Sequence, residues 1–170
     1  STAKAISDAI QKGMPLVERA VSVTGDFIRN PGNYMVKLGT NVQEIIDHCG
    51  GITGDDVVLK MGGPMMGAPI KDTNVPIIKG SNGIIAIAAD HTEEKECIKC
   101  GRCMDVCPME LAPLDIYKYA QLGDAETLLK LNVMDCFSCK CCEYICSSKI
   151  PLVSKINAAK GLVMPLLKKK

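Results

Sequence analysis

Two stretches of this chain repeat one cysteine spacing, C-x2-C-x2-C-x3-C. They read CIKCGRCMDVC and CFSCKCCEYIC and supply Cys97, Cys100, Cys103, Cys107, Cys136, Cys139, Cys142 and Cys146. Bacterial [4Fe–4S] sites use this spacing, often with proline after the fourth cysteine. Zinc sites usually combine paired C-x2-C motifs with histidines or with a second distant pair. The spacing therefore predicts two [4Fe–4S] clusters rather than zinc.

The spacing also predicts how each run folds. Three thiolates two residues apart lie on a looping backbone, where they can occupy three corners of a cube while the loop N–H groups point at the sulfurs. We expect the fourth cysteine to begin a helix, with Pro108 in its first turn, where no N–H partner is needed. Ser147 replaces this proline in the second run, and Pro151 indicates a later helix start there.

In two-cluster proteins with these runs, the fourth cysteine of each run binds the other cluster. We therefore expect cluster 1 on Cys97, Cys100, Cys103 and Cys146, and cluster 2 on Cys107, Cys136, Cys139 and Cys142. Such crossed ligation brings the clusters close together, as an electron relay requires. Eight thiolate ligands leave no open coordination position, and no general base lies nearby, so no catalytic residue is predicted.

The remaining cysteines and both histidines fall outside this pattern. Cys141 does not fit the spacing and is expected to be spare. Cys49 lies on the apolar face of a predicted helix and is expected to be a small buried hydrophobe. His48 and His91 are expected to be exposed and not to bind metal.

The first half of the chain has the pattern of a compact α+β unit. We predict a helix over residues 1–12 and strands over 17–26, 34–40, 56–61 and 81–88, with a turn at 30–33. A helix follows Thr40, with Gln43 in the capping-box position and a buried face made of Val42, Ile45, Ile46 and Cys49. The order strand, strand, helix, strand, strand indicates a β-grasp domain over residues 14–89.

The second half is predicted to be helical. Residues 90–96 are polar and are interpreted as a linker. The spacer 108–135 has the pattern of helix, turn, helix, with Pro113 at a helix start and Gly123-Asp124 at the break. A further helix is predicted over 150–161. Small ferredoxins link their halves with β-hairpins, so this spacer favours an α-helical ferredoxin domain over residues 97–170.

Composition excludes several classes of function. The net charge of +1 gives no basic surface for nucleic acid. No apolar run reaches the ~20 residues of a transmembrane helix, and no signal peptide is evident, so the cysteines indicate a reducing, cytoplasmic compartment. The loop 62–69 is rich in glycine but has neither a phosphate-loop lysine nor a G-x-G-x-x-G motif. Lys168–Lys170 are expected to form a solvated tail, with a membrane-surface contact as the alternative.

The order of these parts resembles a known family. PLVERAVSVTGDFIRNPGNYMVKLGTNVQEIIDHCGG, KMGGPMMG and KGSNGIIAI resemble the SLBB β-grasp domain of the C subunit of the Rnf electron-transport complex. CIKCGRCMDVCPMELAPLDIYKYAQLGD and MDCFSCKCCEYICSSKIPLVSKINAAKG resemble the helical two-cluster ferredoxin domain of that subunit. Residues 1–13 resemble the tail of its preceding flavin- and NADH-binding domain, and the chain, which opens without methionine, is expected to be a processed chain or a piece of a longer protein.

The resemblance implies a role in an ion-translocating ferredoxin:NAD oxidoreductase. This chain would relay electrons as a peripheral subunit at the cytoplasmic face of the membrane. Its implied partners are other subunits of the complex, especially an iron–sulfur subunit, through which it reaches the membrane. FMN and NADH are expected only in the N-terminal domain, which these residues lack, so the chain alone should not oxidise NADH.

Two alternative functions remain open at the level of sequence. One is a fragment of a cobalamin reductase-type iron–sulfur flavoprotein, which tight corrinoid binding would favour. The other is a β-grasp docking or ligand module whose clusters are only structural. Reversible reduction of the clusters at low potential would separate an electron relay from such a scaffold.

Overall fold

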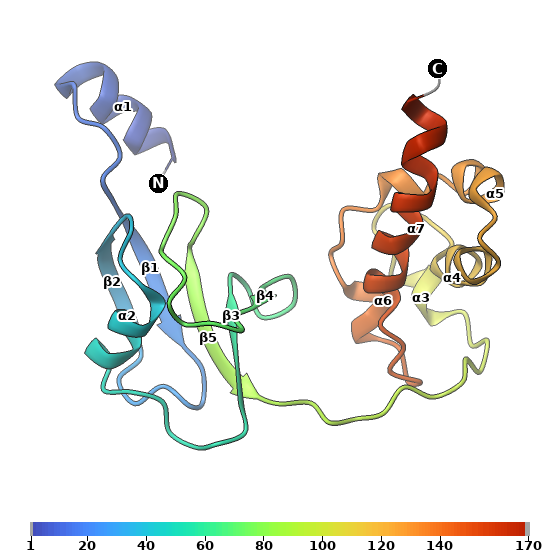
Figure 1. Ribbon diagram of the computed structural model, residues 1–170, viewed down its shortest axis with the longest axis horizontal. Helices are drawn as coiled ribbons and strands as arrows, with labels where there is room; N and C mark the ends of the chain where they lie inside the picture. The colour runs from blue at the N-terminus through green and yellow to red at the C-terminus, as the bar shows by residue number, and fades with distance from the viewer. Residues whose placement is uncertain (1, 169–170) are drawn as a thin grey trace. The chain divides into compact units, whose positions relative to one another are not determined.

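The computed structural model describes residues 2–168 and divides into two compact units, residues 1–90 and residues 91–170 (Figure 1). The first unit begins with helix α1 (Thr2–Lys12), none of whose residues is buried. The predicted helix 1–12 is therefore observed from Thr2 onward, and Ser1 lies outside the described residues. Apolar Ile6 and Ile10 of α1 are both more than half exposed.

A five-stranded mixed sheet forms the body of the first unit. Its strands are β1 (Glu18–Thr24), β2 (Gly32–Lys37), β3 (Val57–Met61), β4 (Ala68–Pro69) and β5 (Gly83–Ala88), in the order β2-β1-β5-β3-β4. β1 is antiparallel to β2 and parallel to β5, and β3 is antiparallel to both β4 and β5. Helix α2 (Val42–His48) follows β2 (Figure 1). This arrangement is the predicted β-grasp.

The core of the first unit lies between the sheet and α2. Alternate residues of β1, Val21 and Val23, are fully buried, as expected of a strand with one face covered. They pack in one apolar cluster with Ile45, Ile46 and Cys49 from the helical segment. The predicted burial of Cys49 is confirmed.

The start of α2 differs from the prediction. Asn41, rather than Thr40, is the N-cap, and Glu44 takes the capping-box position instead of Gln43. The backbone N–H of Asn41 donates to Glu44 Oε1 at 3.4 Å. Thr40 belongs to the turn after β2, where its carbonyl accepts a hydrogen bond from the N–H of Ile77 at 2.8 Å. The cap therefore shifts by one residue.

Two further details of the sheet were not predicted. The second strand begins at Gly32, within the predicted turn 30–33, and ends at Lys37 rather than at residue 40. The glycine-rich loop after β3 contains the short strand β4, which pairs with the end of β3. A tight turn precedes β4, because the N–H of Gly67 donates to the carbonyl of Gly63 at 2.8 Å.

The second unit is helical. It contains α3 (Arg102–Asp105), α4 (Pro113–Leu122), α5 (Ala125–Lys130), the 3-10 turn η1 (Val133–Asp135), α6 (Cys141–Tyr144) and α7 (Leu152–Lys168). Pro113 begins α4 as predicted. Gly123 ends α4 in the left-handed conformation, and Asp124 caps α5 by accepting from the N–H of Thr127 at 3.0 Å.

Helix α7 is longer than the predicted 150–161. It continues through Gly161 and Pro165 to Lys168. Val163, beyond the predicted end, is fully buried in a cluster with Ile116 and Leu128 of the neighbouring helices. Burying a valine side chain contributes about 1.5 kcal/mol or more, which exceeds the cost of about 1 kcal/mol for a glycine inside a helix. Packing therefore carries the helix past Gly161.

Candidate metal centre

The eight cysteines of the two runs line two separate pockets in the second unit. The first pocket is lined by the thiol residues Cys97, Cys100, Cys103 and Cys146. The second pocket is lined by Cys107, Cys136, Cys139 and Cys142. Each pocket thus combines the first three cysteines of one run with the fourth cysteine of the other.

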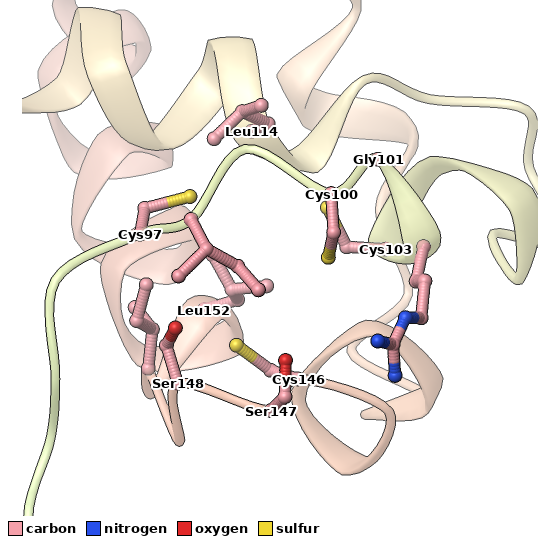
Figure 2. A pocket seen from close by; sticks show the side chains of 12 residues that line it. Cys97, Cys100, Gly101, Cys103, Leu114, Cys146, Ser147, Ser148 and Leu152 are labelled. Carbon is pink, nitrogen blue, oxygen red and sulfur yellow. The ribbon is translucent and has the colours of Figure 1, made fainter.

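Figure 2 shows the first pocket from close by. The thiols of Cys97, Cys100 and Cys146 surround one space, and they come from chain segments on different sides of it. The empty space there is about 400 Å³, including the part open to solvent. The rest of the wall is mostly apolar and includes Leu114 and Leu152.

The second pocket has a similar wall. Its empty space is about 290 Å³, and Phe137, Leu111 and Val153 are among its apolar lining residues. Cys141 is not among the residues that line either pocket. A hydrogen bond with Cys139, together with burial, raises the pKa of the Cys141 thiol.

The two runs fold as near copies of each other, offset by 39 residues. α3 corresponds to α6 at this offset, and the start of α4 corresponds to the start of α7. Left-handed backbone recurs at three pairs of positions with the same offset: Lys99 and Ser138, Gly101 and Lys140, Glu110 and Lys149. Such residues are uncommon outside glycine, so their repetition identifies a backbone path that both runs require.

The left-handed residue between the first two cysteines turns the backbone toward a sulfur. The N–H of Lys99 lies 3.4 Å from Cys97 Sγ and donates to it. This contact is one instance of the predicted N–H groups that point at the sulfurs. Hydrogen bonds to cluster sulfurs are one of the means by which a protein sets the potential of such a site.

The predicted helix after the fourth cysteine is wrong in the first run. The short helices α3 and α6 lie inside the runs, and Cys107 follows α3 instead of beginning a helix. Pro108 is therefore not in a first helical turn, and the next helix begins at Pro113, after the left-handed residue Glu110 has redirected the chain. In the second run, the later helix start indicated by Pro151 is confirmed, since α7 begins at Leu152.

Burial and neighbouring thiols disfavour the thiolate form in both pockets. Burial raises the pKa of Cys103, and the neighbouring thiols Cys100, Cys146 and Cys97 raise it further. Burial, with Cys136 as the first charged neighbour, raises the pKa of Cys142 to about 12. Thiolates that share one pocket repel one another, and bound iron would supply positive charge in addition to that of Arg102 in the first pocket and Lys140 in the second. The donor sets, four thiols per pocket within apolar walls, fit [4Fe–4S] clusters.

Within residues 2–168, no three His, Cys, Asp or Glu side chains are grouped closely enough to hold a metal ion. All ten cysteines are free thiols. His48 and His91 are exposed, as predicted, and His48 makes an edge contact with the ring of Tyr34.

Four residues around the pockets were missed by the sequence reasoning. Ser148 is buried, and its hydroxyl donates to the carbonyl of Glu96 at 2.9 Å. Glu143 accepts from the N–H of Val153 at 3.1 Å, in the first turn of α7. The third and fourth are Asn157 and Lys160 of α7, which contact the second cysteine run. Aligning the two runs at the 39-residue offset would have identified all four as positions where the copies differ.

Comparison with known proteins identifies two domains and a family. Residues 20–69 match the SLBB domain, and residues 96–150 match the 4Fe-4S dicluster domain. None of the helices within residues 2–168 combines the length and the apolar character that a membrane crossing requires.

Three curated relatives illustrate the similarity. The C subunit of the ion-translocating oxidoreductase complex of Rhodobacter capsulatus is 46% identical over 164 residues, covering 95% of this chain and 32% of the relative. The C subunit of the Na(+)-translocating ferredoxin:NAD(+) oxidoreductase complex of Acetobacterium woodii is 37% identical over 94% of this chain and 37% of its own length. The proton-translocating counterpart of Clostridium ljungdahlii is 42% identical over 66% of this chain and 25% of its own length.

This chain spans about a third of the length of the curated relatives it matches. Within that span, the SLBB match covers residues 20–69 of the β-grasp unit, and the dicluster match covers both cysteine runs, as the resemblance of the sequence implied. The chain therefore belongs to the family of C subunits of ion-translocating oxidoreductase complexes and carries an SLBB domain and a 4Fe-4S dicluster domain.

Proposed function

We propose that this chain relays electrons through two [4Fe–4S] clusters within an ion-translocating ferredoxin:NAD oxidoreductase complex. Cluster 1 is assigned to Cys97, Cys100, Cys103 and Cys146, and cluster 2 to Cys107, Cys136, Cys139 and Cys142. The observation that carries the proposal is the crossed origin of the thiols, because each pocket combines three cysteines of one run with the fourth of the other. This is the ligation pattern of two-cluster electron carriers.

The residues around the pockets suit electron transfer. The two pockets adjoin each other, because Cys103 of the first pocket packs against the apolar cluster that contains Cys142 of the second. A bound [4Fe–4S] cluster supplies the chemistry, which is the uptake and release of single electrons. The protein supplies eight thiolates, apolar walls that limit water, and a backbone that fixes the spacing between the two sites.

The domain roles follow the same proposal. Residues 97–170 form the ferredoxin domain, residues 90–96 a linker, residues 14–89 the SLBB-like β-grasp domain, and residues 1–13 the tail of a preceding flavin- and NADH-binding domain. FMN and NADH are assigned to that preceding domain. The names of the relatives, all subunits of complexes, support partners among other subunits. Within this proposal, an iron–sulfur subunit is the main partner, and the chain lies peripherally at the cytoplasmic face of the membrane.

Anaerobic reconstitution of the 170-residue chain tests the proposal. We expect about eight iron and eight sulfide per chain, and two low-potential signals in electron paramagnetic resonance that appear and disappear reversibly. Saturation at one zinc or at four iron would contradict the two assigned sites. Clusters that cannot be reduced reversibly would indicate a structural role, and tight binding of a corrinoid would favour a cobalamin reductase.

A further inference from the structure

The two cysteine runs are near copies, but helix α7 contacts only the second of them through polar side chains. The ammonium group of Lys160 donates a hydrogen bond to the backbone carbonyl of Cys136. One turn earlier on the same helix, Asn157 Oδ1 accepts from the hydroxyl of Ser138 at 3.0 Å. Both contacts reach the loop that carries the first two cysteines of the second run, Cys136 and Cys139.

The first run has no equivalent of these contacts. At the 39-residue offset, Lys160 corresponds to Gln121 of α4, an uncharged residue whose amide donates to the hydroxyl of Tyr117 at 2.9 Å. Asn157 and Ser138 correspond to Lys118 and Lys99, two cations that cannot form a hydrogen bond with each other. The two copies therefore differ in sequence at the very positions that form the polar contacts with the second run.

The ammonium group of Lys160 forms no ion pair with a carboxylate within residues 2–168. The carboxylate of Glu143 in α6 instead accepts from the N–H of Val153 at the start of α7, where the helix dipole stabilises its charge. Lys160 is half-buried, so solvent and salt screen its charge less than that of a surface lysine.

We propose that the positive charge of Lys160 raises the reduction potential of the cluster in the second pocket. This inference rests on the proposed function, since it requires a cluster in each pocket. Reduction adds one electron to the cluster, supplied in the test by dithionite, with no bond made or broken and no proton moved. A fixed positive charge beside the ligand loop stabilises the added negative charge, so its removal makes reduction harder.

Redox titration of the reconstituted full chain, followed by electron paramagnetic resonance, tests the role of Lys160. In Lys160→Gln, whose amide can still donate a hydrogen bond, we expect one of the two midpoints to shift to a more negative potential and the other to stay. Lys160→Arg should restore the midpoint, because it keeps the charge. Asn157→Ala, which removes only the uncharged contact to the same loop, should shift neither midpoint appreciably.

The matched control for charge is Lys130→Gln, at an exposed lysine at the end of α5. It makes the same change in net charge and should leave both midpoints in place. Unchanged midpoints in Lys160→Gln, or an equal shift in Lys130→Gln, would overturn the inference. A shift in Asn157→Ala as large as in Lys160→Gln would also overturn it, since loop geometry would then explain the effect.

The same measurements separate this inference from the function on which it rests. A wild-type chain without two reducible clusters contradicts the proposed function itself. A wild-type chain with two reducible clusters, together with an unresponsive Lys160→Gln variant, contradicts only the role of Lys160. The shift should also persist in a Cys146→Ser background, where the second pocket alone retains its four thiols.

Discussion

Ser148 connects the two chain segments that close the first pocket, and its substitution is expected to speed the release of iron from that pocket. The hydroxyl donates to the carbonyl of Glu96 at 2.9 Å, and the N–H of Lys95 donates to the carbonyl of Ser148 at 2.9 Å. These bonds tie the segment just before Cys97 to the loop just after Cys146. Ser148→Ala removes the first bond and leaves the second, which is between backbone groups.

The expected magnitude follows from the burial of the two groups. Ser148 is 5% exposed, whereas Glu96 is an exposed residue, so water can partly replace the lost donor. The net loss is therefore that of an ordinary hydrogen bond, about 1 kcal/mol. A change of about 1 kcal/mol in the opening equilibrium corresponds to roughly a fivefold change in the open population. The second pocket lacks this bond, because Met109 occupies the position that corresponds to Ser148.

The assay is anaerobic release of iron to an excess of a ferrous chelator. In Ser148→Ala, we expect half of the iron to leave about fivefold faster than in the wild type, while the other half keeps its rate. Ser154→Ala, at an exposed serine of α7, is the control and should release iron as the wild type does. Unchanged release in Ser148→Ala, or equal acceleration of all the iron, would refute the reasoning.

Three further predictions concern the fold and the spare thiol. Gly25→Ala should lower the free energy of unfolding of the first unit by roughly 3 kcal/mol in denaturant, because φ is +118° and the new Cβ would lie 2.0 Å from the carbonyl oxygen of Ala86. A decrease below about 1 kcal/mol would disprove this close approach. Hydrogen bonds from Thr127 lower the pKa of Asp124 below 3.8, so the carboxylate stabilises α5 above pH 3.8 and this stabilisation is lost as the pH falls through the lowered pKa. The helix signal of Asp124→Asn in circular dichroism should lack this acid dependence, and a pH profile identical to that of the wild type would contradict the role of Asp124. Cys141→Ser should keep both clusters by iron analysis, and loss of four iron would show that the ligand register is wrong.

The cysteine spacing predicted which thiols share a pocket, because a covalent pattern of ligands restricts the fold more strongly than helix or strand propensity does. The spare role of Cys141 stays a prediction, since its thiol does not line either pocket but forms a hydrogen bond with Cys139. The spacing did not predict the short helices inside the runs, since α3 and α6 each span only four residues and leave no periodicity to detect. The sequence also did not predict the left-handed backbone conformation at Lys140, because lysine has no intrinsic preference for this conformation.

The predicted start of α2 and the predicted end of α7 were wrong because tertiary contacts override the local sequence signal at both positions. Thr40 and Gln43 form an acceptable capping box by sequence, but the hydrogen bond from Ile77 to Thr40 moves the cap to Asn41. Gly161 is a normal helix stop, yet burial of Val163 continues the helix. Neither contact is local in sequence, so a reading confined to short windows cannot detect them.

The crossed ligation is the central claim, and thiol footprinting of two variants tests it most directly. Reconstituted Cys146→Ser and Cys107→Ser are treated anaerobically with an alkylating reagent, and the labelled cysteines are identified by mass spectrometry. In Cys146→Ser, we predict that the thiols Cys97, Cys100 and Cys103 become reactive while Cys136, Cys139 and Cys142 stay protected, and that iron falls by half. Cys107→Ser should give the reverse pattern. If each variant instead exposes the other three cysteines of its own run, the crossed arrangement is contradicted.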